Sequence, residues 1–97
     1  MLGASPEKVG LSAQRDALVL SYAGGQTELI AAASLRLACR CAFCTRARVD
    51  GVFPQSFDGV TIGTVSAVGE YGINIGFSDG HDRGIYPWSY LATLVGK

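Results

Sequence analysis

The three cysteines of this 97-residue chain all lie within six consecutive residues, and the chain has a single histidine. Their spacing is Cys39-x-Cys41-x-x-Cys44, and the histidine is His81. Such a tight group of three is not a disulfide framework, and a bridge between Cys39 and Cys41 would be strained. Three thiolates and one imidazole are the ligand set of a closed tetrahedral zinc site. The sequence therefore predicts a bend at Arg40 that lets the three sulfur atoms converge, and a fold that brings His81 to them from a distant hairpin.

The charges around the cysteines fit a metal site. No acidic residue occurs between positions 36 and 48, which contain four arginines: Arg36, Arg40, Arg46 and Arg48. Zinc with three thiolates and a neutral imidazole has a net charge of minus one, and nearby cations favour the thiolate form. The alternative is an exposed basic loop whose reduced cysteines never meet the histidine.

Other chemistries suit the same residues less well. An iron–sulfur cluster usually takes four thiolates, so a histidine or a second chain would have to complete the set. The facial triad of non-haem iron oxygenases needs two histidines. A nucleophilic dyad of Cys44 with His81 would leave two cysteines unexplained, and no further motif would orient it. We therefore expect structural Zn²⁺ and no enzymatic activity.

The overall composition limits the class of partner and the compartment. Hydrophobic residues make up 48% and charged residues 16%, which is typical of a globular domain. Eight basic and eight acidic residues cancel, which argues against nucleic acid or an anionic membrane as the general partner. No apolar run approaches the roughly 18 residues of a membrane span, and residues 1–8 lack the apolar centre of a signal peptide. Free thiols favour a reducing compartment, so we expect a cytoplasmic protein.

Hydrophobic and turn patterns in the first half predict one hairpin and a helix. Residues 17–22 and 27–30 should be its strands, joined by a tight turn at Gly24-Gly25. The alanine-rich segment 31–38 should form a short helix or turn that leads to Cys39. Residues 45–60 have no sustained period and contain turn formers, so we expect a long surface loop there.

The second half predicts another hairpin followed by a helix. Residues 61–68 and 71–77 should be strands, with Tyr71, Ile73, Ile75 and Phe77 on one face and room for close approach at the glycines of the other. A turn at Asp79-Gly80 should lead to a short return strand over 84–86. A helix should start near Pro87 and end at Gly96, with one apolar face formed by Trp88, Leu91, Ala92 and Val95.

These elements predict one α+β domain over residues 1–97. It should contain a small, mainly antiparallel β-sheet built from two hairpins, a short helix near the cysteines and a C-terminal helix. Residues 1–15 are polar and irregular, and we expect them to form a loosely structured arm.

Two segments together resemble a known family. The first is Leu35-Arg36 followed by the cysteine motif. The second is the block from Phe77 to Leu91, Phe-Ser-Asp-Gly-His-Asp-x-Gly-Ile-Tyr-x-Trp-x-Tyr-Leu. They resemble the gamma-butyrobetaine hydroxylase-like N-terminal domain family, and the resemblance runs roughly from Ser12 to Leu94.

The resemblance implies more than the spacing does. In the carnitine-pathway hydroxylases this domain precedes a catalytic domain and binds zinc through three cysteines and one histidine, which carry over to Cys39, Cys41, Cys44 and His81. The domain is also found fused to Mrp-like P-loop ATPases with iron–sulfur clusters, and as small free-standing bacterial proteins of unknown function, the kind that this chain resembles. Neither the hydroxylase catalytic domain nor a P-loop motif occurs here, so neither activity is implied. Many bacterial relatives lack the cysteines, which implies that the fold does not require the metal.

We therefore expect a non-enzymatic zinc-binding module that contacts another protein, such as an Mrp-like P-loop ATPase or an iron–sulfur protein. The alternative is an accessory or carrier protein in iron–sulfur cluster metabolism that uses the same cysteines. Candidate contact residues are Arg36, Arg40, Trp88 and Tyr90. In the alternative, the aromatic residues pack against the core and the arginines are solvated residues that balance nearby charge.

Overall fold

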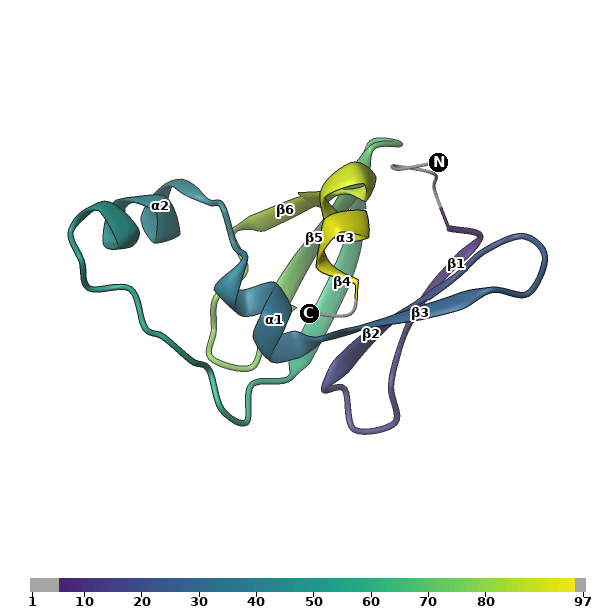
Figure 1. The fold of residues 1–97 in the computed structure, drawn as a ribbon, viewed down its shortest axis with the longest axis horizontal. Helices are drawn as coiled ribbons and strands as arrows, with labels where there is room; N and C mark the ends of the chain where they lie inside the picture. Colours follow the sequence, from purple (N-terminus) through teal and green to yellow (C-terminus); the bar gives the residue numbers. More distant parts are fainter. Residues whose placement is uncertain (1–5, 96–97) are drawn as a thin grey trace.

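The computed structural model describes residues 6–95, which form two three-stranded antiparallel sheets and three short helices (Figure 1). The first sheet has the order β1-β2-β3 and comprises Lys8–Leu11, Ala17–Ser21 and Thr27–Ala31. The second has the order β4-β5-β6 and comprises Ile62–Val68, Gly72–Phe77 and Gly84–Pro87. The helices are α1 (Ala32–Leu37), α2 (Ala42–Val49) and α3 (Trp88–Leu94). The predicted α+β class, with a short helix near the cysteines and a C-terminal helix, is confirmed.

The first sheet contains the predicted hairpin and one strand that we did not predict. Strands β2 and β3 pair with Leu18 opposite Ile30, both buried, and the turn residues Gly24 and Gly25 have positive φ. Strand β1, which pairs with β2, lies within the segment that we expected to be a loosely structured arm. That expectation is therefore wrong for Lys8–Leu11. Four residues with two apolar side chains give too short a pattern to identify a strand. The first five residues of the predicted arm lie outside the described range.

The second sheet confirms the predicted alternation in β5. The side chains of Ile73, Ile75 and Phe77 are buried, whereas Tyr71, expected on the same face, is 54% exposed because it lies in the turn before the strand. The backbone of β6 approaches closely at Gly72, where an added Cβ atom would lie 2.8 Å from the Cα atom of Pro87. The expected close approach at a glycine is therefore present.

Helix α2 corrects the prediction of a long loop over residues 45–60. The helix runs to Val49, and irregular structure follows from Asp50 to the start of β4. Its side toward the body carries Cys44, which is buried, and Ala47, which is half-buried. Because neither is a large apolar residue, the hydrophobic period that normally reveals a surface helix is weak.

Helix α3 begins directly after Pro87, close to the predicted start. Leu91 is buried, while Trp88, Ala92 and Val95 are half-buried. The predicted end at Gly96 lies outside the described residues. Of the three helices between residues 6 and 95, none has the length and apolar character that crossing a membrane requires.

The core joins the two sheets to α1 and α3. The backbone N–H of Ile62, at the start of β4, donates to the carbonyl oxygen of Arg15 at 2.7 Å and so links the sheets. Tyr86 in β6 is fully buried, and its hydroxyl donates to the carbonyl oxygen of Leu35 in α1 at 2.6 Å. The buried cluster also includes Cys39 and Cys44. The thiol groups of these two residues therefore border the core rather than a surface loop.

Candidate metal centre

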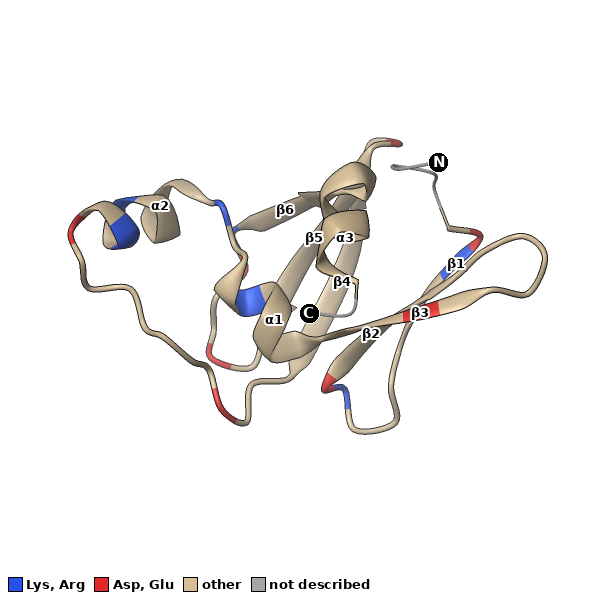
Figure 2. Cartoon of the chain, viewed as in Figure 1, with Lys and Arg blue, Asp and Glu red and all other residues tan. Residues whose placement is uncertain are grey.

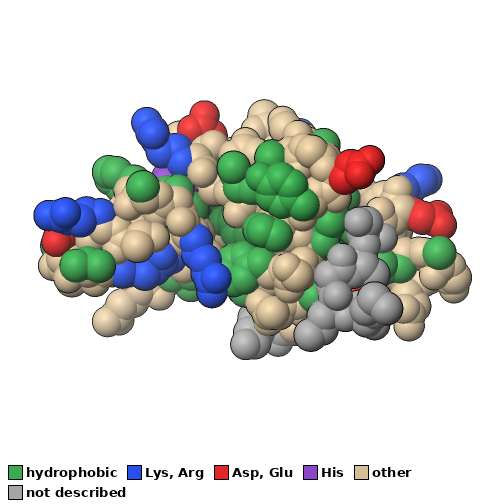
Figure 3. All heavy atoms as spheres, turned by 90° about the horizontal axis from the view of Figure 1, so that it is seen from above, with side chains coloured by type: hydrophobic (Ala, Val, Ile, Leu, Met, Phe, Trp, Pro, Cys, Tyr) green, Lys and Arg blue, Asp and Glu red, His purple; other side chains and the backbone are tan. Residues whose placement is uncertain are grey.

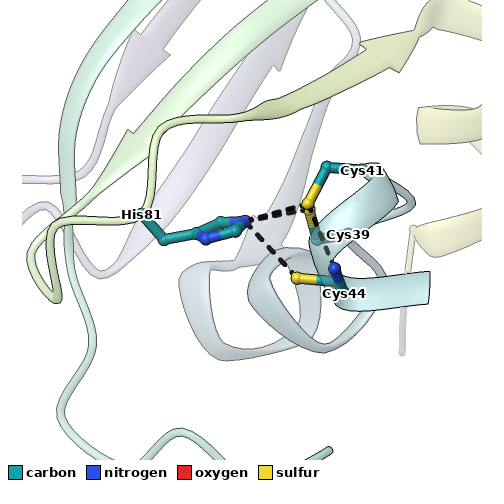
Figure 4. A group of neighbouring side chains, drawn as sticks. All are labelled: Cys39, Cys41, Cys44 and His81. Carbon is teal, nitrogen blue, oxygen red and sulfur yellow. Dashed lines mark hydrogen bonds between the residues drawn. The ribbon is translucent and has the colours of Figure 1, made fainter. Parts of the chain in front are cut away.

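The structure brings the three cysteines and the histidine together (Figure 4). Cys39 follows α1, Cys41 is the N-cap residue of α2, and Cys44 lies in the first turn of α2. His81 comes from the connection between β5 and β6. The four candidate ligand atoms all lie within 4.8 Å of one another. The alternative in which the histidine never meets the cysteines is therefore wrong.

The spacing of these atoms matches the size of a zinc coordination shell. The Nε2 atom of His81 lies 3.2 Å from Cys39 Sγ, 3.5 Å from Cys41 Sγ and 3.4 Å from Cys44 Sγ. Zinc bonds of about 2.3 Å to sulfur and about 2.0 Å to nitrogen, at tetrahedral angles, place a sulfur and a nitrogen ligand about 3.5 Å apart. The residues present therefore fit a tetrahedral ion with three sulfur ligands and one nitrogen ligand.

The link between α1 and α2 brings the cysteine side chains together. Residues 39 and 40 lie between the helices and interrupt the helical path at the predicted bend. The backbone N–H of Cys44 donates to Cys41 Sγ at 3.3 Å, so the Cys41 side chain caps α2. This cap orients the Cys41 sulfur over the first turn of the helix, on the side where Cys44 lies.

Strand β6 passes directly beside the Cys39 sulfur. A Cβ atom built at Gly84 would lie 2.9 Å from Cys39 Sγ and 2.9 Å from the ring of Tyr86. No side chain larger than a hydrogen atom fits there without a shift of the backbone. The sequence showed Gly84 as part of the resemblance to the family, but its contact with a sulfur ligand could not be predicted.

Two hydrogen bonds of the His81 backbone fix the loop that carries this residue. The N–H of His81 donates to Asp79 Oδ1 at 3.0 Å, and its carbonyl oxygen accepts from the N–H of Phe77 at 2.8 Å. Burial, with the positive charge of Arg36 as a further contribution, lowers the pKa of His81 below its usual value. The lowered pKa favours the neutral form of the imidazole, which is the form that binds a metal.

Arg36 lies inside the fold, with 7% of its surface exposed. Its Nε atom donates to Asp79 Oδ2 at 2.9 Å, its Nη1 atom donates to Cys44 Sγ at 3.3 Å, and its Cζ atom lies 4.3 Å from the centre of the Phe57 ring. These contacts do not fit the partner-contact role that we predicted for Arg36. They also identify Asp79, which we expected only as a turn residue, as a neighbour of the site.

The local environment changes the acidity of several groups. Burial raises the pKa of Cys39 to about 11. Burial also opposes ionisation of Cys41, but hydrogen bonds from the Cys44 and Phe43 backbone N–H groups contribute to a net lowering of its pKa. For Asp79 the effect of burial is likewise outweighed, because the hydrogen bond from Arg36 lowers the pKa of the carboxyl group. In the metal-free protein Cys41 is therefore a better thiolate than Cys39.

The other three predicted contact residues make interactions within the chain. The Arg40 side chain is exposed, with its Cζ atom 4.1 Å from the centre of the Tyr90 ring. The Tyr90 hydroxyl donates to the carbonyl oxygen of Ala38 at 2.7 Å, and Trp88 Nε1 donates to the carbonyl oxygen of Glu70 at 3.0 Å. The packing role that was our alternative for the aromatic residues is therefore present. Contact of Arg40, Trp88 and Tyr90 with a partner stays a prediction.

The fold and the site define a small α+β domain with a Cys₃His group that could hold a metal ion. The family model described as gamma-butyrobetaine hydroxylase-like, N-terminal matches residues 9–92. The chain belongs to this family, which confirms the resemblance found in the sequence. No curated protein matches the chain.

Solved structures share this fold over nearly the whole chain. A crystal structure of a protein of unknown function from Acidithiobacillus ferrooxidans, a member of the DUF971 family, is 27% identical with a TM-score of 0.70 and covers 96% of this chain and 94% of its own. Two solution structures are 26% and 28% identical, with TM-scores of 0.73 and 0.65. These matches cover 94% and 93% of this chain, and 68% and 71% of the chains in those structures.

Proposed function

We propose that this protein is a non-enzymatic zinc-binding module whose metal has a structural role and whose surface contacts another protein. The observation that carries the proposal is the fit of the four ligand atoms to a zinc shell. Cys39, Cys41, Cys44 and His81 would hold the ion. Four protein ligands close the tetrahedral shell and leave no position for a substrate or a reactive water, which is why we infer no enzymatic activity.

A structural ion would join two distant parts of the chain. The cysteines lie between and within α1 and α2, whereas His81 lies in the β5–β6 connection. A small domain has a modest core, and metal binding to the folded state adds directly to its stability. The three thiol groups are free, and metal ligation of free thiols suits the reducing cytoplasm in which we place the protein.

An accessory or carrier role in iron–sulfur metabolism is the second candidate, with a Mrp-like ATPase or an iron–sulfur protein as partner. The partial exposure of Cys41 and His81 favours it, because an exchangeable group must reach its ligands from outside. Three thiolates are one fewer than such clusters usually take, so a histidine or a partner's ligand would complete the set.

Metal analysis of protein purified anaerobically without chelator separates the two candidates. About one zinc ion per chain, lost in Cys41→Ala and retained in Thr45→Ala, supports the structural zinc module. Thr45 is a suitable control because it is an exposed residue of α2 beside Cys44, and its hydroxyl donates to the carbonyl oxygen of Arg40 at 3.4 Å. Iron, sulfide and visible absorbance support the carrier. Metal-free protein whose folding is unchanged in Cys39→Ala contradicts both.

A further inference from the structure

Helix α2 and the segment after it expose large apolar side chains, although the Phe43 ring also lies 6.5 Å from the His81 ring, centre to centre. Phe43 is 68% exposed and Val49 is 77% exposed, and Val52 in the segment after the helix is 71% exposed. Phe43, Arg46 and Val49 are three residues apart and therefore share one side of the helix. A surface helix normally has the opposite polarity, with its large apolar residues toward the core.

Basic side chains accompany this apolar surface. Arg40, Arg46 and Arg48 are exposed, and the one acidic residue between positions 36 and 52 is Asp50, which pairs with Arg46 at 3.1 Å. The whole chain is neutral, so the positive excess is local. Figure 3 shows basic and hydrophobic side chains side by side at the end of the molecule where α2 lies, and Figure 2 shows basic positions on the ribbon of α2. This surface complements one that carries carboxylates around apolar anchors.

We propose that this surface, which we name the α2 face (Phe43, Arg46, Val49 and Val52, flanked by Arg40), docks an acidic segment of a partner protein that inserts apolar side chains. The inference rests on the proposed function, since it names the surface and the chemistry of the partner. Three apolar residues and an eight-residue helix are a small anchor for a lipid surface, where binding strength scales with buried apolar area. They are sufficient for a few anchoring contacts in a protein interface.

The α2 face is connected to the metal centre through the helix itself. Cys41 caps α2 and Cys44 lies in its first turn, so two of the four candidate ligands position this helix. Helix α2 lies at one end of the molecule, apart from both sheets (Figure 1). A hydrogen bond from Arg48 Nη2 to the carbonyl oxygen of Leu37, at 2.6 Å, also ties α2 to the end of α1. Metal binding would therefore fix the orientation of the docking surface.

A designed peptide tests the proposal directly. The probe is a labelled 16-residue helical peptide with leucines on one side and glutamates on the other, titrated with the zinc-loaded protein. Its counterpart with lysine in place of every glutamate is the charge control. We expect saturable binding of the glutamate peptide that weakens with added salt, and weaker binding by about tenfold in Phe43→Ser and in Val49→Ser. Leu29→Ser is the matched control, because Leu29 is 60% exposed on β3 and should leave binding unchanged.

The other results overturn the proposal. These are equal affinity for the two peptides, unchanged affinity in Phe43→Ser and Val49→Ser, or no saturable binding up to about 1 mM. Binding to phosphatidylglycerol vesicles without binding to the peptide would assign the surface to a membrane. Zinc content and circular dichroism of each variant separate loss of docking from loss of folding. If wild-type protein purified without chelator contains no zinc but still binds the glutamate peptide, the zinc module is contradicted and the docking surface is supported.

Discussion

Arg36 and Asp79, 43 positions apart in the chain, form an ion pair of 2.9 Å beside the candidate metal ligands. The same arginine donates to the sulfur of Cys44, and the same aspartate accepts from the backbone N–H of His81. The pair therefore contacts one residue from each of the two segments that supply ligands. Outer groups of this kind orient ligands and influence metal affinity.

Replacing Arg36 should weaken zinc binding while the four ligands stay in place. In Arg36→Met the buried positive charge beside Cys44 is lost, and the zinc affinity should fall by about 10-fold to 100-fold. Competition with a chromophoric chelator measures the change. Arg36→Lys should restore part of it, because a cation is retained. Arg40→Met, which removes an exposed arginine that lies over the Tyr90 ring, is the control. Equal affinities of Arg36→Met and wild type would contradict the role of Arg36.

A pair of variants should distinguish the effects of the two hydrogen bonds of Asp79 on zinc affinity. Asp79→Asn keeps an oxygen that can accept from the His81 N–H but loses the negative charge beside Arg36, whereas Asp79→Ala loses both interactions. Zinc affinity should therefore decrease in the order wild type, Asp79→Asn, Asp79→Ala. The same chelator competition tests the order. If Asp79→Ala binds zinc as tightly as Asp79→Asn, the bond to His81 does not support the site.

A methyl group at Gly84 should disturb the contact between β6 and Cys39. The new Cβ atom would lie 2.9 Å from the sulfur, so Gly84→Ala should destabilise the fold by about 1–3 kcal/mol and lower zinc occupancy. Gly10→Ala in β1 is a matched control, since its Cβ atom meets nothing within 4 Å. Thermal unfolding and metal content measure the two effects. Equal melting temperatures for the two variants would mean that β6 does not press on Cys39.

The stability of the metal-free protein should rise with pH up to about 8.5 and fall above it. The pKa values of Asp79, His81 and Cys41 are lowered in the folded state, so these groups contribute stability that is lost as the pH falls. For Asp79 and Cys41 the loss continues through the folded-state pKa. For His81 it sets in at the unfolded pKa of about 6.5. Burial raises the pKa of Cys39 to about 11, so its contribution is lost as pH rises from the unfolded value of about 8.5. Urea unfolding in chelator from pH 5 to 10 gives the profile. A steady rise to pH 10 would show that the burial of Cys39 has no such effect.

The local patterns predicted those parts of the fold that depend on neighbouring residues. The alternation through Ile73, Ile75 and Phe77 reflects burial of one face of β5, and residue spacing alone was sufficient to recognise it. Composition and ligand chemistry were likewise sufficient to group His81 with the cysteines.

The features that we did not predict depend on contacts between distant residues or on weak patterns. Helix α2 has no large apolar residue on its side toward the body, and β1 is too short to show alternation. The hairpins were predictable, but their arrangement in two separate sheets was not. The burial of Arg36 depends on Asp79, Cys44 and Phe57 at once, and no spacing in the sequence encodes that meeting.

Zinc K-edge X-ray absorption on the purified protein tests the central claim most directly, because it counts and identifies the ligands. We predict one zinc ion per chain with three sulfur ligands at about 2.3 Å and one nitrogen ligand at about 2.0 Å. In His81→Ala the nitrogen ligand should be replaced by a water oxygen or the ion should be lost. Wild-type protein with no bound metal, or with fewer than three sulfur ligands on the ion, would contradict the account.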